Sequence, residues 1–281
     1  MPHRFDFDAA SALSKGGRSY QEDAVIADYS RGSDIGLTVL ADGMGGHAAG
    51  DIASKIVVTE VFSELMFQCG DREGFEKQIK TRLTEAAMAA NAGLRAHVQA
   101  HPETHGMGAT LVATVILNQH LYWISIGDSP LFLFRDGALR QLNEDHSMAP
   151  QIDFMVRNGL MGAEEARHHP DRNILTSVLF GESVPHVDCP DAPFSLAQGD
   201  ILIVASDGLQ FLTDEEITTV LTEHSHDSSA AIADHLMDRV IALEDPELDN
   251  VSFSLVKLQE AASIGATGHS GVQGEGIRRA G

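Results

Sequence analysis

The sequence contains little cysteine and little positive charge. Its two cysteines, Cys69 and Cys189, form no Cys-x-x-Cys motif, and we therefore expect buried, unpaired side chains rather than a disulfide or a zinc site. Lysine and arginine number 19 against 41 aspartates and glutamates, which gives a formal net charge of −22. This acidity argues against nucleic acid as a partner, because the phosphate backbone favours basic surfaces.

Long apolar runs are also missing. No uncharged apolar stretch approaches the roughly 18 residues that a membrane-spanning helix needs. Residues 1–8 carry acids where a secretory signal peptide would have a basic region and then an apolar core. We therefore expect a cytoplasmic protein without membrane association. The hydrophobic fraction of 43% is that of an ordinary globular protein, and the length permits one large domain.

Hydrophobic periodicity predicts most of the secondary structure. Apolar residues three and four apart predict long helices at 48–67 and 73–100. Shorter apolar runs predict strands. The first two, at 8–29 and 35–41, are an opening pair, and the others lie at 109–117, 121–126, 131–135, 138–142, 194–196, 201–206 and 251–258. Connections of two or three residues in the middle of the chain indicate antiparallel hairpins, since parallel strands need a long crossover.

The remaining segments complete the predicted architecture. Residues 145–182 are expected to form an irregular, partly helical insertion. A capping box from Thr213 to Glu216 predicts the start of a helix, and a second helix is predicted at 228–243. This order predicts an α+β protein, an α-β-β-α sandwich of two packed antiparallel β-sheets flanked by pairs of helices. We expect one domain over 1–260 and a disordered tail over 261–281, because the tail is rich in Gly, Ser and Ala without periodicity.

Three of the apolar runs end in an acid, at Asp42, Asp128 and Asp207. A carboxylate at the end of a buried strand is held on rigid backbone, close to other strand ends. Several converging carboxylates would repel one another and be driven towards their neutral forms unless a cation neutralised them. All donors are oxygens, so the expected cation is a hard one, Mg²⁺ or Mn²⁺.

The sequence resembles the bacterial type 2C metal-dependent Ser/Thr protein phosphatases from about residue 14 to residue 258. Each matching block is weak alone, since an Asp-Gly after a strand is commonly a turn, but together the blocks follow the family's order. They are Arg18-x-x-x-Glu22-Asp23-Ala24 and the segments 41–47 (ADGMGGH), 106–111 (GMGATL), 127–129 (GDS), 145–147 (DHS), 172–176 (RNILT), 206–208 (SDG) and 249–250 (DN).

The resemblance implies a site for two Mn²⁺ or Mg²⁺ ions and a possible third. Asp42 would bridge the two ions, and Asp207 and Asp249 would complete the first site. Glu22 and the backbone carbonyl of Gly43 would complete the second. Asp128, sharing Asp207, would hold the third and weaker ion.

Further roles also follow from the resemblance. Asp23 and Asn250 would orient ligands and metal-bound waters. Arg18 would bind the substrate phosphate, because a planar guanidinium can bond two phosphate oxygens. The implied reaction is in-line attack of a metal-bridging hydroxide on phosphoserine or phosphothreonine in proteins. The implied partners are phosphoprotein substrates and a cognate Ser/Thr kinase, and the expected state is a monomer.

Two positions depart from the family pattern. Met44 stands where animal members carry a histidine proposed as general acid, so a metal-bound water would protonate the product. We assign His47, three residues later, to a turn or helix start and not to the role of general acid. Pro130 follows Gly127-Asp128-Ser129 where many relatives have arginine, which leaves the third-metal region less defined. The flap at 147–169 is expected beside the site, where it would influence which phosphoprotein is accepted.

The sequence also permits three alternatives. Residues 43–48 satisfy a loose G-x-G-x-x-A dinucleotide fingerprint, but a second long helix follows where a Rossmann unit needs a parallel strand. An inactive phosphatase-like module would have lost metal ligands, whereas all the implied acidic ligands are present. A phosphorylated anti-sigma antagonist stays open as the substrate.

Overall fold

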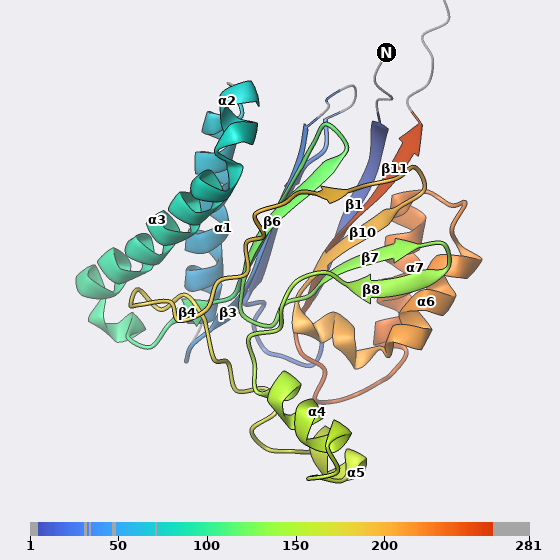
Figure 1. Cartoon of the computed structure of the whole chain (residues 1–281). Coiled ribbons are helices and arrows are strands. Elements are labelled where there is room, and N and C mark those ends of the chain that lie inside the picture. The colour runs from blue at the N-terminus through green and yellow to red at the C-terminus, as the bar shows by residue number, and fades with distance from the viewer. Residues whose placement is uncertain (1–4, 31–32, 34, 47–48, 71, 261–281) are drawn as a thin grey trace, which may run out of the picture.

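The computed structural model describes residues 5–30, 33, 35–46, 49–70 and 72–260. Two β-sheets lie face to face, and helices cover the outer face of each (Figure 1). The five-stranded sheet has the order β1 (Phe5–Ser14), β11 (Val251–Glu260), β10 (Ile201–Ala205), β7 (Leu131–Arg135) and β8 (Ala138–Gln141). The second sheet has the order β2 (Asp23–Asp28), β3 (Ile35–Met44), β5 (Leu111–Leu117), β6 (His120–Ile126) and β9 (Phe194–Ser195), with β4 (Gly108–Ala109) paired to β3.

The helices form two outer layers and a projection. One layer contains α1 (Ala49–Gln68), α2 (Arg72–Lys77) and α3 (Ile79–Ala100), and the other contains α6 (Asp214–Glu223) and α7 (Ser229–Ile241). The short helices α4 (Ala149–Arg157) and α5 (Ala163–Arg167) form the flap, which projects from one end of the sandwich (Figure 1). Short 3₁₀ turns, η1 (Pro102–Thr104) and η2 (Asp207–Phe211), follow α3 and β10. The predicted α-β-β-α sandwich is confirmed.

The core lies in three layers, because the central strands are buried on both faces. In β3, Leu37, Val39 and Ala41 pack in the cluster that includes α1 and α3, whereas Leu40 packs between the sheets. In β11, residues such as Phe253 face the α6–α7 layer and Val256 faces the other sheet. Side chains alternate along a strand, so apolar residues at both parities fill both layers.

The predicted opening strand at 8–29 is wrong as a single element. Its residues form β1 and β2, which belong to different sheets. The Gly16-Gly17 pair ends β1, because Gly16 has φ +58° and an added Cβ there would lie 2.1 Å from the carbonyl oxygen of Asp249. The loop 15–22 therefore crosses from one sheet to the other.

Two smaller predictions also need correction. The helix expected at 73–100 is two helices, because Gln78 leaves the helical region at φ −119° and its N–H donates to the Phe75 carbonyl in a tight turn. Cys69 and Cys189 are free but only partly buried, at the edge of the helix-covered core; burial still raises the pKa of the Cys189 thiol to about 11.

The dinucleotide alternative fails on topology. After α1 the chain continues into α2 and α3, and within the described residues β3 pairs only in antiparallel fashion. No helix in the described part of the chain is both long and apolar enough to cross a membrane. His47 and the expected tail at 261–281 lie outside the described residues.

Candidate metal centre and active site

The strand ends at the flap end of the sandwich gather the predicted acids. Antiparallel register places Asp23 of β2 opposite Asp42 of β3. Asp42, Asp128 and Asp207 line one cavity of about 330 Å³ together with Thr110 and five other residues. Asp42 comes from one sheet and Asp207 from the end of β10 in the other, so both sheets contribute to the site.

Burial and mutual repulsion raise the pKa values of these carboxyls. The pKa of Asp42 lies well above its usual range, because the group is buried and Asp23 and Asp207 are close. Burial and the neighbouring Asp207 raise the pKa of Asp128 to about 7. Burial and the neighbouring Asp249 raise the pKa of Asp207 to about 6. The site is thus a concentration of negative charge in a poorly solvated place.

The donor set fits the expected ions. Oδ1 of Asp23 and Oδ1 of Asp207 are buried and have no hydrogen-bond partner among the described residues. Buried polar atoms are normally paired, so such oxygens need an explanation. Carboxylate oxygens are the ligands that Mg²⁺ and Mn²⁺ prefer, and a divalent cation would offset the repulsion among them.

The second predicted ligand set meets at the start of α1. The backbone N–H of Gly43 donates to the Glu22 carbonyl at 3.1 Å. An added Cβ on Gly43 would lie 2.0 Å from the Gly50 carbonyl oxygen, and one on Gly50 would lie 2.5 Å from Oε1 of Glu22 and 2.7 Å from the Gly43 carbonyl oxygen. The Glu22 carboxylate and the Gly43 carbonyl therefore approach the same point beside Gly50. Burial raises the pKa of Glu22.

Asn250 fixes the loop that carries Arg18 and Glu22. Its Oδ1 accepts from the backbone N–H of Glu22 at 2.7 Å. Its Nδ2 donates to the carbonyls of Lys15 and Tyr20, each at 2.9 Å. This side chain thus holds both ends of the loop against the start of β11.

Hydroxyl groups support the acids in a way that the sequence did not reveal. Thr110 Oγ1 accepts from the backbone N–H of Asp42 at 2.9 Å and lies 2.8 Å from Ser129 Oγ. Ser206 Oγ donates to Oδ2 of Asp23 at 2.7 Å. Thr110 and Ser206 both lie within the family blocks, beside a strand end or an acid. This location is the sequence feature that could have identified them.

Arg18 lies at the rim of the site. Its Nη2 is 2.6 Å from Oδ2 of Asp249, and 55% of its side chain is exposed. A guanidinium here is both accessible from solvent and adjacent to a predicted metal ligand. The position suits the predicted contact with a substrate phosphate.

The base of the flap borders the site. The N–H of Thr176 donates to the His146 carbonyl at 2.7 Å, and Arg172 pairs with Asp153 at 2.7 Å. Flap-base residues such as Asn173 line a second cavity of about 380 Å³ with Asp128 and Asp207. The structure therefore places the flap beside the acids, as the sequence predicts.

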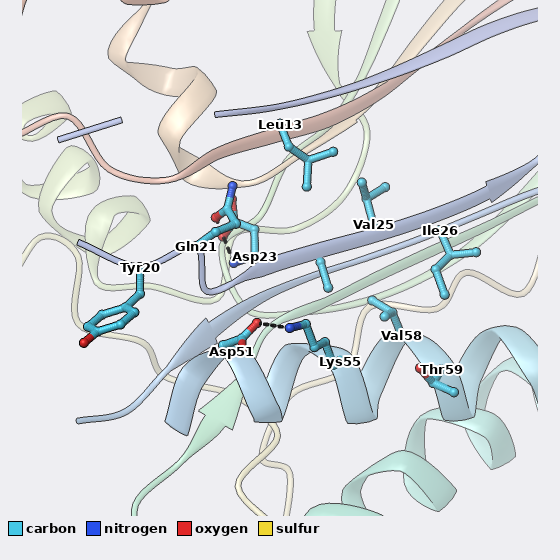
Figure 2. A pocket seen from close by; sticks show the side chains of 11 residues that line it. Leu13, Tyr20, Gln21, Asp23, Val25, Ile26, Asp51, Lys55, Val58 and Thr59 are labelled. Atoms are coloured by element: carbon cyan, nitrogen blue, oxygen red, sulfur yellow. Dashed lines mark hydrogen bonds and ion pairs between the residues drawn. The ribbon is translucent and has the colours of Figure 1, made fainter. Parts of the chain in front are cut away.

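A third cavity, of about 540 Å³, reaches Asp23 from the side of α1 (Figure 2). It lies between β2 and α1, and Lys55 on its wall pairs with Asp51 at 2.6 Å. Tyr20, which is 61% exposed, stands at one end of it, in the same loop as Arg18. This surface is next to the site and includes apolar side chains such as Val25, Ile26 and Val58.

Comparison with known proteins agrees with this geometry. A family model described as protein phosphatase 2C matches residues 16–249. The Ser/Thr protein phosphatase PstP of Mycobacterium tuberculosis is 33% identical over 236 residues, which cover 84% of this chain and 41% of that protein. The chain therefore spans about two fifths of that relative. Protein phosphatase PhpP of Streptococcus pneumoniae is 31% identical over 80% of this chain and 86% of its own length.

A solved structure is also similar. The crystal structure of the PstP catalytic domain with two manganese ions has a TM-score of 0.73 and 28% identity, and the match covers 91% of this chain and 100% of that one. The fold and the matched length agree. The chain belongs to the protein phosphatase 2C family.

Proposed function

We propose that this chain is a metal-dependent phosphatase that hydrolyses phosphoserine and phosphothreonine in proteins. The observation that carries the proposal is the half-buried cluster of Asp42, Asp128 and Asp207 around one cavity. The raised pKa values of these carboxyls support a site for cations. The PstP relative, which is named as a Ser/Thr protein phosphatase, supports the substrate class.

The ligands would divide between the ions as the resemblance implies. Asp42 would be shared, with Asp207 and Asp249 on one ion and Glu22 with the Gly43 carbonyl on the other. Asp128 would serve a third ion. When bound, Mn²⁺ or Mg²⁺ supplies Lewis acidity, which makes a bound water nucleophilic and offsets phosphate charge.

The protein's own groups bind and orient the substrate. Arg18 presents its guanidinium at the rim and would bond the phosphate oxygens, while Asn250 keeps the Arg18 loop in place. Among the described residues that line the two acidic cavities there is no histidine, and Met44 lines one of them. We therefore assign protonation of the leaving alkoxide to water rather than to a side chain.

The cellular setting belongs to the same proposal. We propose a cytoplasmic monomer that opposes a Ser/Thr kinase, with the flap selecting among phosphoprotein substrates. The names of the relatives support the Ser/Thr specificity, and the flap's place beside the acids supports its role.

The test is hydrolysis of p-nitrophenyl phosphate and of a phosphothreonine peptide, with Mn²⁺ and with EDTA. We expect Mn²⁺-dependent turnover of both, and its loss in Asp42→Asn and Asp207→Asn. Asp191→Asn is the matched control, because its side chain is 90% exposed and pairs only with Lys80 in the described part of the chain. Turnover that survives EDTA, or equal activity in all three variants, contradicts the proposal.

A further inference from the structure

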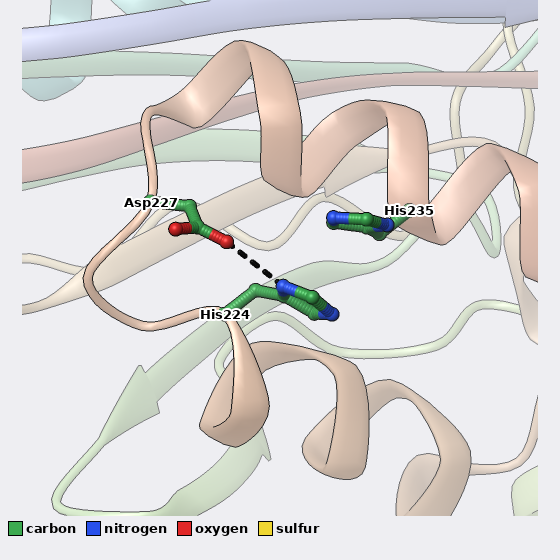
Figure 3. Close-up of side chains that lie close together, drawn as sticks. All are labelled: His224, Asp227 and His235. Atoms are coloured by element: carbon green, nitrogen blue, oxygen red, sulfur yellow. Dashed lines mark hydrogen bonds and ion pairs between the residues drawn. The ribbon is translucent and has the colours of Figure 1, made fainter.

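Two histidines and an aspartate meet at the turn between α6 and α7, on the outer layer of the five-stranded sheet (Figure 3). His224 Nδ1 lies 2.8 Å from Oδ2 of Asp227. The rings of His224 and His235 stack with centroids 3.7 Å apart. One potential ligand atom from each of the three residues lies within 4.8 Å of the other two. Three potential metal ligands therefore converge away from the acidic cavities.

The turn that carries these groups is held by its own hydrogen bonds. The backbone N–H of Asp227 donates to the His224 carbonyl at 2.9 Å, and this bond closes the turn between the two residues. Ser228 then caps α7, since its Oγ accepts from the Ala231 N–H, and His235 lies on the second turn of that helix. The three side chains are thus carried by a short turn and one helix.

A buried lysine on the neighbouring β-strand also holds this turn in place. Lys257 of β11 is 8% exposed, and its Nζ donates to the carbonyls of Ser225 at 2.8 Å and Asp227 at 2.6 Å. The ammonium group is therefore bound to backbone oxygens. Among the described residues, the one ion pair of the Asp227 carboxylate is with His224, so no lysine or arginine there competes for that carboxylate.

One nitrogen of each ring lies on the side of Asp227. In Figure 3 a ring nitrogen of His235 lies at the same end of the stack as the Asp227 carboxylate and the Nδ1 of His224. Two imidazole nitrogens and one carboxylate oxygen are a donor set for Zn²⁺, which prefers nitrogen and sulfur more than Mg²⁺ does. The phosphatase centre offers oxygens alone, so the two sites differ in the metal that they select.

We propose that His224, Asp227 and His235 bind one Zn²⁺, with water in the fourth position. On binding, the metal replaces the proton that His224 Nδ1 shares with Asp227, and that proton leaves to solvent. The ion joins the end of α6 to α7 and stabilises the outer layer without contacting the phosphatase centre. The proposal does not depend on the phosphatase activity.

The chain offers a matched comparison. His97 and His101 on α3 also stack, with centroids 4.5 Å apart, and His101 Nδ1 lies 3.4 Å from Oε1 of Glu103. Histidines four apart on a helix face the same side, so this pair is the competing surface site for Zn²⁺. This pair has no third ligand atom within 4.8 Å. Among the described residues, only His224, Asp227 and His235 bring three such atoms together.

The experiment is calorimetric titration of the full-length, EDTA-treated and dialysed chain with Zn²⁺ in saturating Mg²⁺. We expect one binding event whose affinity falls by about tenfold or more in His235→Ala and in Asp227→Asn, since each removes one of three ligands. His97→Ala should change it by less than about twofold. Thermal unfolding gives the second readout: Zn²⁺ should raise the unfolding temperature of the native chain and of His97→Ala, but not of His235→Ala.

Each other result overturns the proposal. No binding event in saturating Mg²⁺ means that the three groups hold no Zn²⁺. Equal affinity in the native chain and in His235→Ala assigns the metal elsewhere. Loss of binding in His97→Ala assigns it to the helical pair. Circular dichroism of each variant without Zn²⁺ separates lost ligands from lost structure.

Discussion

At the residue scale, charge decides the behaviour of the site. Half-buried carboxyls such as Asp42 and Asp128 are destabilised in their ionised form by partial burial and by neighbouring acids. Their placement costs stability in the absence of a cation and favours binding in its presence. Arg18 at the rim is paired with Asp249 and is an accessible group of opposite sign beside them.

The first residue-scale prediction concerns pH. The pKa of Asp128 is raised from 3.8 to about 7, so the folded chain binds a proton more tightly than the unfolded chain does. The metal-free protein should therefore lose stability as pH rises from about 4 to about 7. Asp128→Asn should stabilise the metal-free chain at pH 8 by about 2 kcal/mol, since each pKa unit equals about 1.4 kcal/mol and burial of the amide retains part of the cost. Urea unfolding in EDTA measures this.

The contrary outcome is a metal-free stability that rises over the same pH interval, or an Asp128→Asn variant less stable than the native chain at pH 8. Asp191→Asn, at an exposed position, should show no change and is the control.

The second residue-scale prediction concerns Arg18. Arg18→Ala should raise KM for p-nitrophenyl phosphate by about tenfold with a smaller change in kcat, because a charge-assisted contact to phosphate is lost. Arg239→Ala is the control: Arg239 has the same 55% exposed side chain and pairs with Glu216 on the far helices. A collapse of kcat at unchanged KM would rule out the phosphate-binding role.

At the element scale, the site depends on close contact between a loop, a strand end and a helix start. Gly43 at the end of β3 meets Gly50 in the first turn of α1, and Glu22 lies against both. The loop 15–22 is held between the sheets by Asn250. These contacts bring the predicted oxygen ligands of Glu22 and Gly43 together beside Gly50.

Gly50→Ala tests this contact. The added Cβ would lie 2.5 Å from Oε1 of Glu22 and 2.7 Å from the Gly43 carbonyl oxygen, so α1 or the ligands must shift. We expect Mn²⁺ affinity to fall by about tenfold or more, measured by calorimetry. Gly93→Ala is the control, because the nearest atom to its added Cβ would be an Ile56 methyl at 3.5 Å. Equal Mn²⁺ affinity in both variants would exclude a role for the close contact of Gly50 with Glu22 and Gly43.

The cavity between β2 and α1 gives another element-scale prediction. Tyr20 lies two residues from Arg18 and is 61% exposed, so peptide flanking the phosphoresidue can contact its ring. Tyr20→Ala should raise KM for a phosphothreonine peptide by about threefold to tenfold, as loss of an exposed aromatic contact does. KM for p-nitrophenyl phosphate, which has no flanking residues, should stay constant. A parallel rise for both substrates would place Tyr20 at the phosphate instead.

At the scale of the whole molecule, the predicted metal ligands come from both sheets. Asp42 belongs to β3 of one sheet, whereas Asp207 and Asp249 adjoin β10 and β11 of the other. A cation shared by these acids would bind the folded sandwich and not the separated strands. Metal binding and global stability are therefore linked.

Urea unfolding with and without Mn²⁺ measures this link. Mn²⁺ at about 100 times its Kd should add about 2.7 kcal/mol to the free energy of unfolding. In Asp249→Asn the increment should shrink, because one ligand of the first ion is lost. An unchanged unfolding curve in saturating Mn²⁺ would contradict a site built from both sheets.

Local patterns in the sequence determined most of the elements and the identity of the acids. Periodicity located the helices of both layers, the capping box at Thr213 located the start of α6, and turn-length connections gave antiparallel pairing. The family blocks supplied Glu22, Asp42 and Asp207 as ligands; their metal-binding roles stay predictions. These features depend on neighbours in the chain, which the sequence records directly.

Only the tertiary structure decided how distant segments meet. The division of 8–29 between two sheets follows from pairing β1 with β11, at the other end of the chain. Contact between Gly50 and Glu22, and the meeting of His235 with His224 and Asp227, likewise depend on packing. The physical reason is that long-range register and close approach are set by the summed burial of many residues, which no local pattern encodes.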